Sequence, residues 1–79
     1  MNMEFGWWSR DSEGRRFQMR AKVFADEITW SRKQGHFQSW VDCEPTDDDW
    51  ETLISEASRR VPRRLITSKE FEALKRMKP

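Results

Sequence analysis

The sequence predicts an α+β fold: a four-stranded antiparallel meander of two hairpins, followed by two C-terminal helices packed on one face of the sheet. Two observations carry this prediction. A short Trp-Ser-Arg pattern occurs twice in the first half of the chain, each time ahead of a polar stretch that contains Gly. The apolar spacing then changes from a period of two to the 3.6-residue period of a helix near residue 45. With 79 residues, the chain has room for a single domain, residues 1–79.

The repeated pattern predicts two successive hairpins. Trp8–Arg10 and Trp30–Arg32 share the letters WSR, and each is followed by a polar stretch with Gly14 or Gly35 and then by Phe-Gln. A Gly-containing polar stretch between two aromatic or β-branched runs is typical of a hairpin loop, because Gly accepts a positive φ without a steric clash. A tight turn near Ala25 joins the two hairpins. The sheet is expected to occupy residues 1–43, with strands at Phe5–Arg10, Arg16–Phe24, Glu27–Arg32 and His36–Asp42.

The two faces of the sheet follow from alternation along the strands. In the second strand, Phe17 and Met19 alternate with Arg16 and Gln18, so apolar and polar side chains point in opposite directions. The inner face is expected to hold Trp8, Phe17, Met19, Ala21, Val23, Ile28, Trp30, Phe37 and Val41. The outer face is expected to hold Trp7, Trp40, Arg16, Gln18, Arg20, Lys22 and Gln38.

An amphipathic helix is predicted over residues 46–61. Its apolar stripe begins at Trp50, and the spacing of the stripe is that of one helical face. Thr46 with Asp49 three residues later resembles a capping box, and acids in the first turn and bases in the last complement the helix dipole. Core positions on this helix are Trp50, Leu53, Ile54 and Ala57.

A short C-terminal helix is predicted over residues 67–78. Thr67 and Glu70 repeat the capping-box spacing, and Phe71 opens a narrow apolar stripe that is expected to join the core. Residues 63–66 could form a loop or a short edge strand, and we favour the loop, with Leu65 or Ile66 tucked under the sheet.

The charges are segregated along the chain, although the net charge is only +1. Residues 43–58 carry acids and no base, whereas residues 59–79 are strongly basic. Two interpretations of the basic run Arg59–Arg64 stay open. It complements a helix dipole in a solvated loop, or it contacts phosphates.

The sequence argues against catalysis. Its one His, His36, and its one Cys, Cys43, would lie about 23 Å apart along an extended strand, too far for a dyad. They supply two of the roughly four ligands that a Cys/His zinc site needs. Asp47–Asp49 would radiate around a helix rather than converge on a cation. We therefore expect a non-enzymatic protein with no cofactor or metal. Without a signal segment or a membrane-length apolar run, we expect a bacterial cytoplasmic location and no membrane partner.

Two functions remain open. The first is a small homodimeric interaction module, since exposed aromatic side chains mark partner surfaces. The alternative is a domain that binds single-stranded nucleic acid, since aromatic side chains among basic ones on an open sheet can stack bases. The order of elements resembles two folds that bind single strands, the PUR repeat and the whirly-type domain, although no motif of either occurs here. In both hypotheses the candidate residues are Trp7, Arg16, Arg20, Lys22, Trp40, Arg63 and Arg64.

Overall fold

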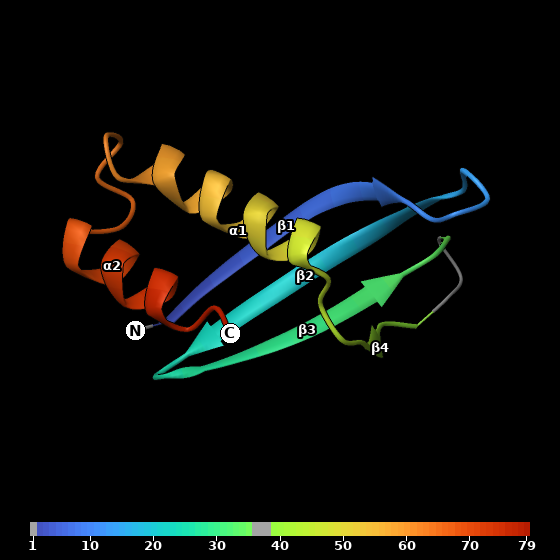
Figure 1. Ribbon diagram of the computed structural model, residues 1–79, viewed down its shortest axis with the longest axis horizontal. Helices are drawn as coiled ribbons and strands as arrows, with labels where there is room; N and C mark the ends of the chain where they lie inside the picture. The colour runs from blue at the N-terminus through green and yellow to red at the C-terminus, as the bar shows by residue number, and fades with distance from the viewer. Residues whose placement is uncertain (1, 36–38) are drawn as a thin grey trace. The chain divides into compact units, whose positions relative to one another are not determined.

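A computed structural model describes residues 2–35 and 39–79 of the chain. In this part of the chain, one antiparallel sheet of four strands is followed by two helices, which confirms the predicted α+β class (Figure 1). The elements are β1 (Asn2–Arg10), β2 (Arg16–Phe24), β3 (Glu27–Lys33), β4 (Val41–Asp42), α1 (Asp47–Arg60) and α2 (Ser68–Arg76). The chain divides into two compact units, Met1–Glu44 and Pro45–Pro79. The assignment of residues 1–79 to a single domain stays a prediction.

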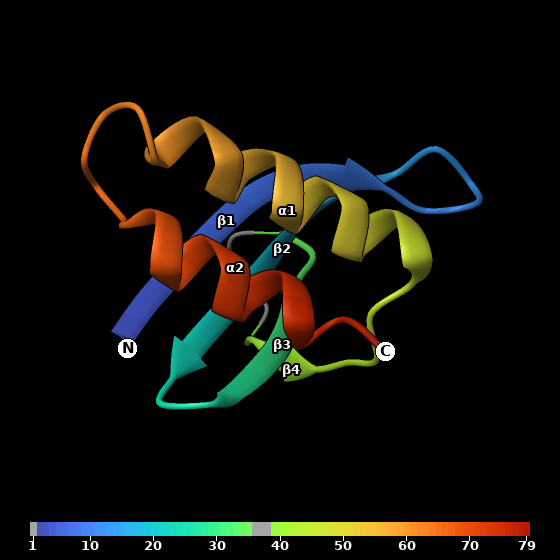
Figure 2. The same ribbon diagram turned by 60° about the vertical axis from the view of Figure 1, so that its left-hand side comes forward.

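The strands are ordered as they occur in the sequence, β1-β2-β3-β4, and each pairs antiparallel with the next. β1 and β2 form a long twisted hairpin whose loop projects beyond the rest of the sheet (Figure 2). A two-residue turn joins β2 to β3, and its first residue, Ala25, has a φ of 55°. The second and third predicted strands and the turn between them are therefore confirmed.

One face of the sheet is buried, and it is the face that alternation in β2 predicts. Because paired residues share a face, Met19 lies beside Trp7 on β1 and beside Arg32 on β3. The buried apolar residues of the sheet are Met3, Phe5, Phe17, Met19, Ala21, Val23 and Trp30. The guanidinium of Arg32 lies 4.0 Å above the ring of Phe17 on this same face.

The sequence-based prediction for the adjacent pair Trp7 and Trp8 is wrong. Trp7 pairs with buried Met19 and meets Trp30 edge to face, with ring centroids 6.1 Å apart, so it lies on the buried face. Trp8 pairs with Gln18 on the outer face and is 53% exposed. A shift of one residue in phase exchanges the two faces of a strand, which explains the inversion.

The fourth strand is much shorter than the predicted range His36–Asp42. Residues 36–38, including the expected core residue Phe37, lie outside the described residues. Ser39 and Trp40 are not in a strand, and of the described residues in this range only Val41–Asp42 pairs with β3. The ring of Trp40 instead reaches the guanidinium of Arg20 on β2. Val41 was expected to be buried and is 62% exposed.

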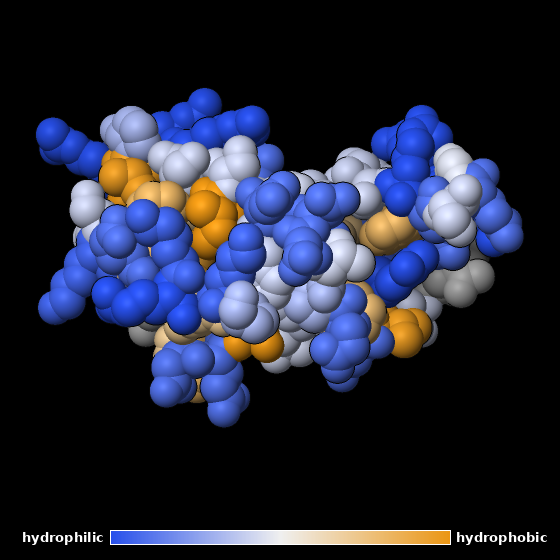
Figure 3. All heavy atoms as spheres, in the orientation of Figure 1, coloured by the Kyte–Doolittle hydropathy of each residue, from blue (hydrophilic) through white to orange (hydrophobic). Residues whose placement is uncertain are grey.

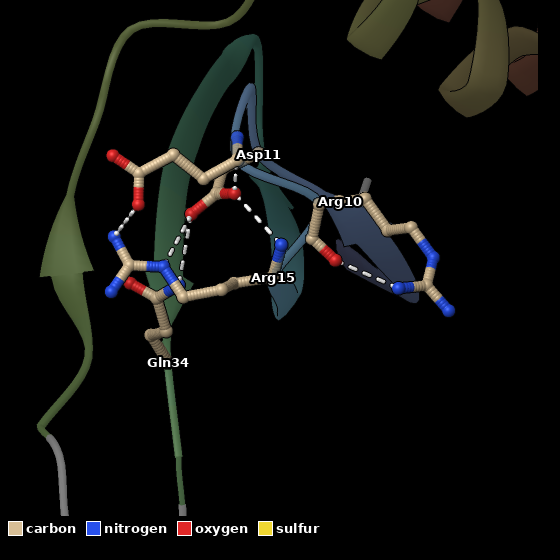
Figure 4. A network of polar contacts seen from close by, with 6 residues as sticks. Arg10, Asp11, Arg15 and Gln34 are labelled. Atoms are coloured by element: carbon tan, nitrogen blue, oxygen red, sulfur yellow. Dashed lines mark hydrogen bonds and ion pairs between the residues drawn. The ribbon is translucent and has the colours of Figure 1, made fainter.

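Asp11 organises the loop between β1 and β2 (Figure 4). Its Oδ1 accepts hydrogen bonds from the backbone N–H groups of Glu13 and Arg15, each at 2.9 Å. Its Oδ2 accepts a 3.1 Å hydrogen bond from Nε2 of Gln34, which follows β3. Asp11 therefore ties the β1–β2 loop to the end of β3.

Both helices begin at the predicted capping boxes. The hydroxyl of Thr46 accepts from the Asp49 N–H and the Asp49 carboxylate accepts from the Thr46 N–H; Thr67 and Glu70 make the same pair of bonds at α2. In Figures 1 and 2, α1 and α2 lie side by side. The buried helix residues are Trp50, Leu53, Ala57 and Leu74.

The prediction is less accurate at the edges of the helical stripes. Ile54 and Phe71 were expected in the core and are only half-buried. In the loop, Ile66 is buried and Leu65 is 64% exposed. Arg64 adopts a positive φ of 61° in this loop.

Candidate functional site on the outer sheet face

The outer face of the sheet is the face opposite the buried one, and its middle is built around Gln18 and Arg20 of β2. Gln18 lies between Trp8 on β1 and Lys33 on β3. Arg20 lies between Gly6 and Ser31 in the same way. Every β2 side chain on this face from residue 16 to residue 22 is basic or Gln, as the alternation predicts.

Cationic side chains stack on the two Trp rings of this face. The guanidinium carbon of Arg16 lies 4.4 Å from the ring centroid of Trp8. That of Arg20 lies 4.0 Å from the ring centroid of Trp40, and Nζ of Lys33 lies 5.8 Å from the same ring. Such contacts contribute about 0.5–1 kcal/mol each at exposed sites and hold long basic side chains against the sheet.

A hollow of about 290 Å³, here called the first hollow, opens between these rings. Its lining includes two aromatic rings, one carboxylate and one guanidinium, contributed by Trp8, Trp40, Glu4 and Arg20. Small-molecule pockets usually have volumes of about 300–1,000 Å³, so this hollow suits a small flat group rather than a large ligand.

The floor of the first hollow is formed partly by Gly6. A Cβ atom added at Gly6 would lie 3.6 Å from the carbonyl oxygen of Met19, which is an ordinary contact. Gly6 is not among the glycines with a positive φ in the described chain. The absence of a side chain here therefore leaves space in front of Arg20, and a larger residue can be introduced without backbone strain.

A second hollow, of about 250 Å³, lies next to the first and shares Trp8 and Gln18 with it. It is also lined by Arg16, Lys33 and Gly35. Among the described residues, no acid lines this second hollow, whereas Glu4 lines the first. Trp8 thus stands between a mixed hollow and a basic one.

The Arg20 side chain is held by stacking. Its Nε is shielded from solvent and has no hydrogen-bond partner within the described part of the chain. A buried donor without a partner usually costs about 1–3 kcal/mol. The contact with Trp40 therefore accounts for the position of the guanidinium better than any hydrogen bond at Nε does.

The structure brings together three of the residues singled out from the sequence, Arg16, Arg20 and Trp40. Lys22 lies on the same face but lines neither hollow. Trp7 belongs to the buried face, although it borders the first hollow beside Trp8. Arg63 and Arg64 are exposed residues of the loop between α1 and α2, in the second unit.

Sequence reasoning missed Trp8, Glu4, Gly6 and Lys33. The signal that places Trp8 was available, because Met3, Phe5 and Trp7 alternate at a period of two and leave Trp8 on the opposite face. No comparable signal identifies Glu4, since its place in the hollow follows from the pairing of β1 with β2.

The described part of the chain has few nucleophilic or metal-ligating side chains placed close together. Sγ of Cys43 lies 3.8 Å from Sδ of Met19, and His36 is outside the described residues. Among residues 2–35 and 39–79, no group of three or more His, Cys, Asp or Glu side chains is placed to hold a metal ion. No helix in this part of the chain has the length and apolar character needed to span a membrane.

Comparison with known proteins gives no relative: no family model matches the sequence, and searches of curated proteins and of solved structures find no match.

Proposed function

We propose that this chain is a non-enzymatic binding module that takes single-stranded nucleic acid on the outer face of its sheet. The observation that carries the proposal is an exposed Trp8 ring that stands between two hollows and has the guanidinium of Arg16 stacked on it. Single-strand binders combine aromatic rings, on which bases stack, with a basic groove that follows the phosphates.

The charges around the Trp rings favour an anionic ligand with flat rings. Arg16, Arg20 and Lys33 already lie within 5.8 Å of the rings of Trp8 or Trp40. A cationic ligand, such as a methylated ammonium group, would meet these like charges. A base with its phosphate meets rings that can stack and cations that can pair.

The hypothesis is tested by anisotropy titration of a fluorescent, mixed-sequence single strand of about 12 nucleotides. Trp8→Ala should weaken binding by about 1–3 kcal/mol, the usual contribution of one stacked base. Phe24→Ala is the matched control. Phe24 is a 70% exposed aromatic residue on the outer face of the same sheet, and it lines neither hollow.

A steric variant tests the position of the site without changing its charge. Gly6→Val should fill the floor of the first hollow and weaken binding, while the melting temperature stays close to that of the wild type. Unchanged affinity for Gly6→Val and Trp8→Ala would show that strands bind elsewhere.

Salt dependence tests the basic residues. Three phosphate contacts by Arg16, Arg20 and Lys33 predict a slope of log K against log salt of about −2, since each contact contributes about −0.7 for single strands. Arg16→Ala should reduce the slope by one contact. If Arg63 and Arg64 also hold phosphates, Arg63→Ala with Arg64→Ala lowers the slope further without changing the effect of Trp8→Ala.

The same variants test the alternative, in which the chain is a homodimeric interaction module. Sedimentation of the wild type as a dimer, dissociated by Trp8→Ala, together with no binding of any strand at low salt, would identify the outer face as an interface between copies of this chain.

A further inference from the structure

β1 forms one edge of the sheet. The strand order is β1-β2-β3-β4, so among the described residues β1 pairs with a strand on one side only (Figure 1). Asn2–Arg10 contains no Pro and no charged residue on its buried face, and its one-to-one register with β2 leaves no bulge. Natural sheets usually protect their edges by such devices, because an unprotected edge pairs with another strand. β1 is therefore suited to extending the sheet.

Backbone groups in the middle of this edge are directed away from β2. The N–H of Asp11 donates to the carbonyl oxygen of Arg15, and these two residues continue the register of the strands. Hydrogen-bonded and non-hydrogen-bonded pairs alternate in an antiparallel ladder, so the odd-numbered residues of β1 bond to β2. The N–H and C=O groups of Gly6 and Trp8 consequently point outward, where a further strand can bond to them.

The side chains beside these backbone groups are complementary to each other. Trp8 presents a ring that is 53% exposed, whereas Gly6, two residues earlier on the same face, presents no side chain. Gly6 lines the first hollow, whose volume of about 290 Å³ suits a small flat group. On a neighbouring strand, an aromatic ring placed over an edge Gly compensates for the missing side chain. β1 thus carries both a ring and a place for one.

We propose that two copies of this chain pair their β1 strands antiparallel about a two-fold axis at Trp7, so that the Trp8 ring of each copy fills the first hollow of the other. Gly6 then stands opposite Trp8 of the partner subunit, and the N–H of each donates to the C=O of the other. The contact is isologous, since every pair of residues occurs twice. The two sheets become one continuous sheet.

The alternative registers fit less well. A shift of two residues in one direction places Gly6 opposite Gly6, and a shift in the other direction places Trp8 opposite Trp8. The proposed register also brings the partner's Arg10 opposite Glu4, so unlike charges face each other. Glu4 already interacts within its own chain, and the pairing uses the sign of its charge rather than a vacant oxygen.

This inference does not rest on the proposed function, but it concerns the same hollow. A contact through one strand edge and two rings is small beside the roughly 1,200–2,000 Å² of stable interfaces, so the dimer should be weak and depend on protein concentration. Because the partner's ring occupies the first hollow, dimer formation and strand binding should exclude each other there.

Amide exchange followed by NMR tests the edge in the wild type without nucleic acid. Exchange at Gly6 and Trp8 should slow about three-fold between about 50 μM and about 1 mM protein, as the dimer forms by mass action. Ile28 is the control. The carbonyl of Trp30 accepts from the Cys43 N–H, so even-numbered residues of β3 point away from β2, and the Ile28 N–H lies on the opposite edge. Slowing at Ile28 alone, or at no residue, overturns pairing through β1.

Two variants test the position of the ring, with sedimentation velocity at about 1 mM as the readout. Trp8→Ala removes the ring and Gly6→Val fills the hollow, so both should sediment as monomers while their NMR spectra remain those of a folded chain. Phe24→Ala is the matched control, since this exposed aromatic residue of the outer face lies outside the paired stretch and should leave the dimer intact. A Gly6→Val dimer as stable as that of the wild type overturns the proposal.

Two further results would decide against it. A wild type that stays monomeric at about 1 mM overturns pairing between copies and leaves the edge to a strand of another protein. A single-stranded oligonucleotide that binds through Trp8 should dissociate the dimer, because both need the first hollow. Binding through Trp8 that leaves the dimer intact would show that the partner's ring does not enter the hollow.

Discussion

Asp11 is the residue that connects most of the polar contacts at the loop end of the sheet. Its carboxylate accepts hydrogen bonds from the backbone N–H groups of Arg15 and Glu13 and from the side chain of Gln34. The backbone hydrogen bond from Arg15, followed by those from Gln34 and Glu13 and by the charge of Arg15, lowers the pKa of Asp11 below its ordinary value of 3.8; partial burial opposes the shift. The ionised carboxylate therefore stabilises the folded chain.

Replacing Asp11 with Asn should reduce the fall in the free energy of unfolding at acidic pH. Because the folded pKa is depressed, the contribution of Asp11 is present above its unfolded pKa and is lost as the pH falls through the folded one. Urea midpoints measured at about pH 5.5 and about pH 2.5 should differ less in Asp11→Asn than in the wild type. Equal differences in the two proteins would mean that the hydrogen bonds of Asp11 do not form in solution.

The turn between β2 and β3 holds a second residue-scale feature, the positive φ of 55° at Ala25. A left-handed conformation costs an L-residue about 1–2 kcal/mol, and the greater freedom of Gly in the unfolded chain offsets about 0.4–1 kcal/mol. Ala25→Gly should therefore raise the free energy of unfolding by about 0.5–1 kcal/mol. Asp26→Gly, at a residue without a positive φ, should lower it; a lower urea midpoint for both variants contradicts this account of the turn.

At the scale of the elements, sequence periodicity predicted β2 well because one phase of its alternation is wholly apolar and the other is polar from Arg16 to Lys22, with Phe24 at the end of the strand as the exception. β1 offers two competing patterns. The WSR repeat suggests that Trp8 should face inward as Trp30 does, whereas Met3, Phe5 and Trp7 place Trp8 outward. The structure follows the second pattern: Trp8 pairs with Gln18, and Trp30 pairs with Ala21. Register across a hairpin, which a single strand does not encode, decides such cases.

The candidate site could be predicted in part for the same reason. The basic face of β2 follows from local alternation, so Arg16 and Arg20 were identified from the sequence. The hollow, however, depends on which residues pairing brings opposite them, Gly6 and Trp8, and on the path of Trp40 outside the sheet. These are contacts between segments, and alternation within one segment carries no information about them.

The hydroxyl of Thr46 caps the N-terminus of α1, and its contribution to stability can be measured. Thr46→Ala removes the 3.1 Å hydrogen bond that the Asp49 N–H donates to Oγ1, and it should lower the free energy of unfolding by about 0.5–2 kcal/mol. Thr52→Ala is the control in the same helix. Its hydroxyl only donates to the carbonyl of Asp48, which lies four residues earlier, and Ala favours helix there. Denaturant midpoints that fall equally in both variants would argue against a capping role for Thr46.

For the whole molecule, the distribution of charge matters more than its sum. The unit Met1–Glu44 carries seven Lys and Arg residues and seven Asp and Glu residues, so it has no net charge. Three of its bases nevertheless line the two hollows, where Glu4 is the acid. Asp11 and Glu13 lie in the β1–β2 loop and form ion pairs with Arg15. A nearly neutral protein can therefore present a basic surface, and low net charge is no argument against an anionic partner.

The five Trp residues of this short chain do not all have the same role. Trp50 is expected to support the fold and Trp8 to bind a ligand, and substitutions at the two positions test this difference. Trp50 is 6% exposed and Trp8 is 53% exposed. Trp50→Ala should lower the free energy of unfolding by about 3–5 kcal/mol, which is most of the stability expected for a domain of this size. Trp8→Ala should change it by about 0.5 kcal/mol, as is usual for a surface position, although the same change should weaken strand binding. Thermal melting followed by far-UV circular dichroism compares the two, with Trp50→Phe as a milder variant in case Trp50→Ala does not fold. A Trp50→Phe melting midpoint at or above that of the wild type would contradict the structural role of Trp50. A Trp8→Ala midpoint far below that of the wild type would show that Trp8 supports the fold rather than a ligand.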